Sequence, residues 1–147
     1  MFDPRSDIKG LFSNHRISGT DKYGNTAYVD IQLREENTEG TIIREGIMIL
    51  EPPRAVTSDL EIGDSKTFDE VVFDANLYVI RKSQIKDYHS FINSVVDTFQ
   101  NTLKTNRHSL SSCDDIRVSN MLSPPVPEAS RKTVFRRLIE VTGWRIA

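Results

Sequence analysis

The stretch Tyr88 to Leu103, YHSFINSVVDTFQNTL, decides the fold. Its apolar residues recur at spacings of one, three and four along the chain: Tyr88, Phe91, Ile92, Val95, Val96, Phe99 and Leu103. This spacing predicts an amphipathic helix from about Ser83 to Thr105 with one wide apolar stripe. Because such a stripe needs an apolar partner, we expect the helix to lie on a sheet.

Three strands are predicted before this helix. In VVFDANLYVI, Val71 to Ile80, the odd-numbered residues are apolar and share one face. Ala27 to Leu33 alternates in the same way, which is typical of a strand with one wet face. Between them, TIIREGIMILEPP is rich in β-branched residues and ends at Pro52 and Pro53, which cannot continue a ladder. The sequence therefore predicts a prominent hairpin before Pro52.

A short helix is predicted at the N-terminus. Asp3 can cap the first free backbone N–H groups, and Pro4 fits the first helical turn. Apolar residues then fall at helical spacing, so the helix should cover about three turns and end near Asn14. A cluster of turn-forming residues follows, where we expect a hairpin to begin: Gly19, Asp21, Gly24 and Asn25.

Two segments are predicted as loops and one as a long strand. Residues Ala55–Phe68 are rich in polar and turn-forming residues, and a loop of about a dozen residues is more often functional than idle. Met121–Ser130 has three prolines within four residues, so it should be a surface arm or loop. Ile116 and Val118 allow a short strand. Thr133–Ile146 alternates over far more than the usual strand length and predicts the last strand.

These elements predict an α+β fold: a mainly antiparallel β-sheet with one long amphipathic helix packed on one face and a short N-terminal helix. The 147 residues fit a single domain, 1–147. No apolar run approaches a membrane span, and the first residues do not resemble a signal peptide, so we expect a cytosolic protein without membrane contact. The single cysteine, Cys113, leaves no internal disulfide and no cysteine cluster for zinc.

The charge is distributed unevenly, although the net charge is only −2. Residues 21–74 hold five Lys or Arg and thirteen Asp or Glu, a balance of −8. Residues 131–147 hold five against one, a balance of +4. This asymmetry favours association with an oppositely charged partner or a second copy. The plainer alternative is that the two regions neutralise each other within one fold.

One local group combines Cys, His and Asp. His108 precedes Cys113 by five residues, and Asp114 and Asp115 adjoin the cysteine. A nucleophilic cysteine requires the histidine to reach its sulfur and a third group to orient the ring. Spacing alone does not establish that geometry, and a free thiol in a polar loop is the commoner interpretation.

Acidic residues at predicted strands raise the possibility of a nuclease. Glu51, Asp69 and Asp74 could hold Mg²⁺, but no Glu-x-Lys or Asp-x-Lys follows on a neighbouring strand. Solvated carboxylates on a wet strand face are commoner. The glycine-rich loops that bind nucleotide phosphates are not found in the sequence. We therefore expect a protein that is not an enzyme and needs no cofactor or metal.

The C-terminal strand carries basic residues with Phe135 and Trp144 among them. The basic residues are Arg131, Lys132, Arg136, Arg137 and Arg145. Such a surface could contact DNA, although a pI of about 5.9 argues against a dedicated nucleic-acid-binding protein. An acidic patch on another copy fits these residues equally well, and a head-to-tail contact of this kind closes into rings.

The later two thirds of the chain resembles the tail terminator and tail completion proteins at the neck of tailed bacteriophages and related archaeal viruses. The resemblance rests on VVFDANLYVI, FINSVVDTFQNTL, the proline-bearing SPPVPEAS and the terminal strand KTVFRRLIEVTGWRIA, in this order. It implies an oligomeric ring, usually a hexamer, that caps the tail tube and joins it to the head connector without an active site. Members of that family commonly begin with a longer helix, which leaves open which neck or tail component this is.

The resemblance implies a structural protein of the virion, present in the host cytoplasm during assembly, whose partners are its own copies, the tail tube and the head connector. DNA would pass through the ring, and the basic cluster would lie at a subunit boundary or face that passage. Contact residues would come from the two predicted loops: Asp59, Glu61, Asp64, Pro124, Pro125 and Pro127. The alternatives are a head-closure or tail-tube protein, or a small nucleic-acid-binding regulatory module.

Overall fold

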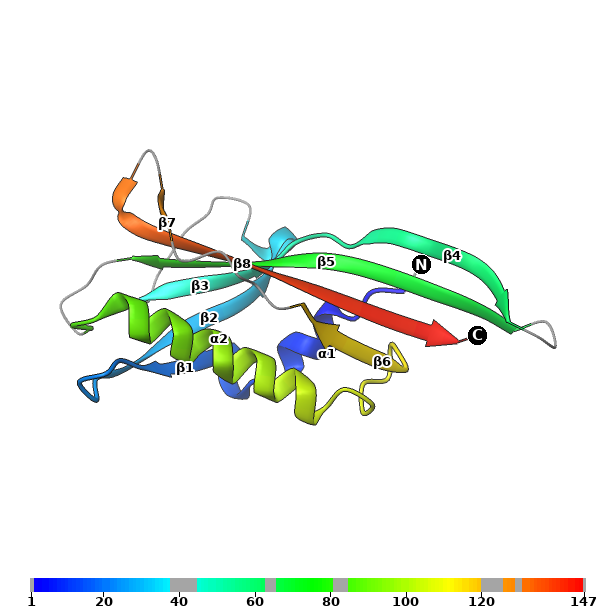
Figure 1. Ribbon diagram of the computed structural model, residues 1–147, viewed down its shortest axis with the longest axis horizontal. Helices are drawn as coiled ribbons and strands as arrows, with labels where there is room; N and C mark the ends of the chain where they lie inside the picture. The colour runs from blue at the N-terminus through cyan, green and yellow to red at the C-terminus, as the bar shows by residue number, and fades with distance from the viewer. Residues whose placement is uncertain are drawn as a thin grey trace.

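The computed structural model describes residues 2–37, 45–62, 66–80, 85–119, 126–128 and 131–146. Its elements are α1 (Arg5–Gly10), β1 (Arg16–Thr20), β2 (Thr26–Leu33), β3 (Gly46–Leu50), β4 (Arg54–Ile62), β5 (Lys66–Ile80), α2 (Tyr88–Thr105), β6 (Asp115–Val118), β7 (Val126–Glu128) and β8 (Arg131–Ile146), with 3₁₀ turns at Ser13–His15 and Arg34–Glu36. The fold is α+β, as predicted, with a mostly antiparallel sheet, one long helix and a short N-terminal helix (Figure 1).

The strand order of the sheet is β1-β2-β3-β5-β8-β6, with β4 paired to β5 and β7 paired to β8. The pair β2–β3 is parallel, and the other described pairs are antiparallel. The hairpin expected at the turn-forming cluster is confirmed, since it joins β1 to β2. A hairpin between β2 and the strand before Pro52 is wrong, because β2 and β3 are parallel. Residues 34–45 connect β2 to β3, and a parallel pair requires a connection of about this length.

The long strand β5 organises the sheet. β8 runs along one side of it, from Phe68 opposite Ile146 to Ile80 opposite Val134. On its other side, β5 pairs first with β4 and then with β3, which lie in one line interrupted by the two prolines at 52 and 53. The predicted apolar face of β5 is confirmed, since all five of its residues are buried: Val71, Phe73, Ala75, Leu77 and Val79.

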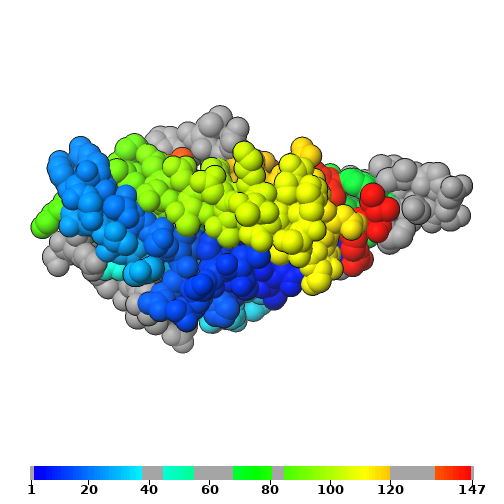
Figure 2. Space-filling model, turned by 90° about the horizontal axis from the view of Figure 1, so that it is seen from below, coloured from blue at the N-terminus to red at the C-terminus, as the bar shows by residue number. Residues whose placement is uncertain are grey.

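The helix α2 buries its stripe against this sheet. All the predicted stripe residues from Phe91 to Leu103 are buried, while Tyr88 is half-buried and stacks on Phe135 of β8 with ring centroids 5.7 Å apart. The N-terminal segment lies beside α2 on the same face, where Phe12 stacks on Phe99 at 5.8 Å (Figure 2). Together they close one face of the sheet.

Gly19 permits the close approach of α2 to the sheet edge. It lies within β1, and a side chain there would overlap Val95 and Phe91 of α2. The prediction that Gly19 belongs to the turn is therefore wrong, because its function is to let a helix pack closely. The turn itself runs from Asp21 to Asn25, and Gly24 adopts a φ of 85° there.

Asp21 joins this turn to the start of α2. Its carboxylate accepts backbone N–H bonds from Tyr23 at 3.0 Å and Asn25 at 2.9 Å within the turn. It also accepts them from Lys86 at 2.9 Å and Asp87 at 3.3 Å before the helix. Burial by itself would raise the pKa of this carboxyl, but the N–H donors outweigh burial and hold its pKa well below the usual range. One ionised side chain therefore fixes the position of the helix relative to the hairpin.

The first helix is shorter than predicted. α1 ends at Gly10, and Phe12 is already extended with φ −102° and ψ 124°, so the helix does not continue to Asn14. The predicted N-cap position of Asp3 is wrong, because Pro4 is the N-cap of α1; Asp3 lies one residue earlier and accepts from the backbone N–H of Arg5 at 3.1 Å.

The loop predicted for Ala55–Phe68 is also wrong. β4 and the beginning of β5 form a hairpin there, with register shifts between Ala55 and Thr57 and between Thr57 and Leu60. Each shift breaks the period-two alternation by which a strand is recognised. In the predicted proline arm, Val126–Glu128 forms the short strand β7 against β8, and the described part of that arm is therefore paired.

Replacing Phe91 with alanine should reduce the free energy of unfolding by about 3–5 kcal/mol, because the fully buried ring leaves a cavity between α2 and the sheet. Asn101→Ala, on the exposed face of the same helix, is the matched control and should change it by less than about 0.5 kcal/mol. Urea titrations followed by circular dichroism measure both. Equal effects of the two substitutions would contradict the packing of α2 described above.

Candidate interaction surfaces

The basic residues of β8 do not form one patch. Arg136 lies on the face away from α2 and donates to the Asn76 side-chain oxygen at 3.2 and 3.0 Å. Arg137 lies on the helix face and donates to Asn93 of α2 at 2.9 Å. Neighbouring residues of a strand point to opposite faces, so this separation follows from the pairing of β8.

The other basic residues lie at the two ends of β8. Arg131 and Lys132 begin the strand, where the backbone of Arg131 pairs with Glu128. Arg145 lies near its end, 3.8 Å from Asp69 and over the ring of Phe2. Eight residues of extended chain, roughly 27 Å, separate it from Arg137. The structure therefore distributes the predicted cluster over two faces and two ends.

A polar network crosses the sheet on the face away from α2. Arg34 binds both carboxylate oxygens of Glu51, at 2.8 and 2.7 Å. Asn76 donates to Glu51 at 2.8 Å and accepts from Arg136, so that four side chains from four parts of the chain form one connected series. Such bidentate, charge-assisted bonds are stronger than neutral ones and fix the side-chain geometry.

The network lowers the pKa of Glu51. The hydrogen bond from Arg34 is the largest cause, partial burial opposes it, and Asn76 adds to the lowering. A second group lies beside it, where Arg54 contacts Asp74 at 3.2 Å and Glu140 at 3.3 Å. This face of the sheet therefore presents ordered, paired charges.

Sequence reasoning did not identify Arg34 and Asn76 as members of a site. A signal was available, because Asn76 interrupts the apolar strand VVFDANLYVI and is 5% exposed in the structure. A buried amide needs hydrogen-bond partners, which predicts polar side chains opposite it on neighbouring strands.

The group around Cys113 does not have the geometry of a nucleophile and its base. Cys113 belongs to the hydrophobic core, and burial raises the pKa of its thiol to about 11. His108 is exposed, and its Nδ1 lies 3.2 Å from the Asp114 carbonyl oxygen. A thiol with a raised pKa stays protonated at neutral pH and is a weak nucleophile.

The three carboxylates considered for a metal are each bound by other side chains. Glu51 pairs with Arg34, Asp74 with Arg54, and Asp69 lies 3.8 Å from Arg145. In the part of the chain that the structure describes, no three His, Cys, Asp or Glu side chains gather as metal ligands would. These carboxylates are therefore members of ion pairs.

The β4–β5 hairpin carries the first set of predicted contact residues. Asp59 and Glu61 lie on β4, and among the described strands β4 pairs with β5 alone. The β5–β8 pairing begins at Phe68, opposite Ile146. Glu61 of β4 pairs with Thr67, which precedes Phe68 and has no partner in β8. The hairpin therefore continues past the last β5–β8 pair by Lys66 and Thr67 of β5, at the right of Figure 1, and the outer edge of β4 has no strand partner among the described residues.

The second set of predicted contact residues is described only in part. Pro127 lies in β7 at the other end of β8, where its backbone pairs with Phe135. Asp64, Pro124 and Pro125 lie outside the described residues. Of the described members, Asp59 and Glu61 thus lie toward one end of the long β5–β8 pair and Pro127 toward the other.

Replacing Glu51 with glutamine should lower the free energy of unfolding by about 1–3 kcal/mol at neutral pH, because it removes the charged partner of Arg34. The pKa of Glu51 is lower in the folded state than its ordinary 4.5, so its stabilisation is complete above that pH and lost as the pH falls through the folded value. The difference between wild type and variant should therefore narrow at about pH 3.

Urea titrations at the two pH values measure this difference. Asp97→Asn, an exposed carboxylate on α2, is the control and should have little effect at either pH. A Glu51→Gln difference that stays the same in acid would show that the ion pair is not its source.

Comparisons with known proteins add no family assignment. No protein-family model matches the chain, and no curated protein matches its sequence. Within the described ranges, the structure contains no helix long and apolar enough to cross a bilayer.

Proposed function

We propose that this protein is a structural subunit that assembles with its own copies into a ring, and that the ring lies at the head–tail junction of a tailed virus. In this role it caps the tail tube, joins it to the head connector and performs no catalysis. The proposal combines the resemblance of the strand, helix and C-terminal strand to tail terminator proteins with one structural observation, the open hairpin.

The open β4–β5 hairpin carries the proposal. Beyond Phe68 the hairpin is two strands wide, and along its length the outer edge of β4 has no strand partner among the described residues. Two-stranded ribbons are marginally stable in water, and open edges present unpaired backbone groups. A neighbouring subunit that covers this hairpin would both stabilise the two-stranded part and give the unpaired backbone groups of the β4 edge hydrogen-bond partners.

The charge of the hairpin supports a contact between copies. Residues 54–71 hold five acidic and two basic residues, whereas residues 131–147 hold five basic and one acidic. Although the basic residues of β8 do not form one patch, unlike charges in different segments of one chain favour a head-to-tail contact. Such a contact closes into a ring when the rotation between subunits allows it.

The purified protein should sediment with a mass several times 16.8 kDa at high concentration, and negative-stain images of that material should show rings. Gold-labelled antibodies on purified virus particles should mark the junction of head and tail. A protein that stays monomeric both alone and with isolated tail tubes, or particles that lack the chain at the collar, would refute the proposal.

A further inference from the structure

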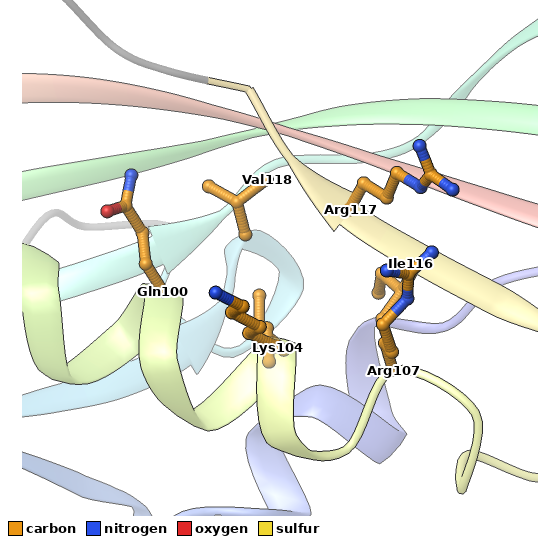
Figure 3. A pocket seen from close by; sticks show the side chains of 7 residues that line it. Gln100, Lys104, Arg107, Ile116, Arg117 and Val118 are labelled. Carbon is orange, nitrogen blue, oxygen red and sulfur yellow. The ribbon is translucent and has the colours of Figure 1, made fainter.

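A pocket of about 180 Å³ lies between the C-terminal turns of α2 and strand β6 (Figure 3). Its lining comes from the helix, the turn after it and the strand: Gln100, Leu103, Lys104, Arg107, Ile116, Arg117 and Val118. The volume has room for one or two side chains. It is separate from the polar network on the far face of the sheet.

The rim of the pocket is cationic. Arg107 binds both oxygens of Asp115 at 2.9 Å, and Arg117 contacts the same carboxylate at 3.3 Å. Lys104 is exposed and has no acidic partner among the described residues. Two arginines thus share the Asp115 carboxylate while Lys104 stands beside them, and these four charged groups sum to +2. The negative end of the α2 dipole offsets only about half a charge of this.

The floor of the pocket is apolar. Leu103 and Ile116 are each 1% exposed, and Val118 lies beside them as a partly buried side chain. Figure 3 shows Gln100 and Lys104 projecting from α2 beside Val118 of β6. A cationic rim over an apolar floor suits a carboxylate carried next to apolar side chains, which is the chemistry of an acidic peptide. Nucleic acid offers phosphates without such apolar neighbours, and the net charge of −2 disfavours it.

The β4–β5 hairpin has this chemistry. On β4, Leu60, Glu61 and Ile62 follow one another, and Asp59 precedes them. Glu61 of the hairpin lies opposite Thr67 of β5. At the pocket, Phe73 of β5 is level with the Val141–Val118 pair. Thr67 and Phe73 are six positions apart along β5. This is roughly 20 Å of extended strand. β4 also lies on the other side of β5 from β6, so the hairpin of one chain does not reach the pocket of the same chain.

We infer that the pocket between α2 and β6 binds the acidic β4–β5 hairpin of a second copy. The inference rests on the proposed ring and names its contact, with Lys104 facing the carboxylates of β4 from the neighbouring subunit. Because two different surfaces meet, the contact is heterologous and repeats around a ring.

The experiment measures self-association of the full chain by sedimentation velocity over a range of protein concentrations. Lys104→Glu should weaken association at least about tenfold, and Glu61→Lys should do the same. The double variant restores opposite charges and should recover most of the loss. Lys86→Glu, an exposed lysine before the other end of α2, is the matched control and should leave association unchanged.

Each outcome decides the inference. If wild type assembles and Lys104→Glu assembles equally well, the pocket is not the contact, although the ring stands. If wild type remains monomeric alone and on tail tubes, both proposals fall. If a short DNA duplex binds and Lys104→Glu abolishes that binding while self-association persists, the pocket is a nucleic-acid site and the inference is wrong. Urea midpoints establish that each variant folds, and Asp59→Lys replaces Glu61→Lys if the latter does not.

Discussion

The burial of the α2 stripe against the sheet is the interaction on which the rest of the structure depends. Phe91, Val95 and Phe99 are fully buried, and Gly19 in β1 lets the helix approach closely enough to bury them. Full burial of each such side chain contributes about 1.5–3 kcal/mol, so this contact outweighs any single surface ion pair. Asp21 then sets where the helix begins, because its carboxylate is bonded to the backbone on both sides of the junction.

The β5–β8 pair gives the two faces of the sheet different functions. One face of β5 is apolar and packs beneath α2, whereas the other carries Asp74, Asn76 and Tyr78. Ion pairs on the second face remain partly exposed, with 33% exposure for Arg34 and 22% for Glu51, so each contributes modestly to stability. Their larger effect is on geometry, since Asn76 joins the Arg34–Glu51 pair to Arg136 and holds the strands in one register.

The sequence predicted the elements with regular periods and missed those whose periods are broken. The α2 stripe, the alternation of β5 and the last strand all follow from spacing. β4 escaped notice because its register shifts disrupt alternation, and β1 because Gly19 resembles a turn residue. The parallel pairing of β2 with β3 is a long-range property that local pattern does not encode. The pocket was missed for the same reason, since Lys104 and Arg117 are neighbours only after folding.

The sequence and register of β4 carry the features by which natural sheets limit edge pairing. Natural sheets prevent indiscriminate edge pairing with charged side chains and bulges, and β4 has both, in Asp59, Glu61 and its two register shifts. These features repel a second β4 edge, because like charges would lie opposite each other. A cationic surface carries no like charge, so the acidic residues of β4 do not repel it. In the proposed contact, the same acidic residues direct the hairpin toward a partner of opposite charge, which is the surface between α2 and β6 of a second copy.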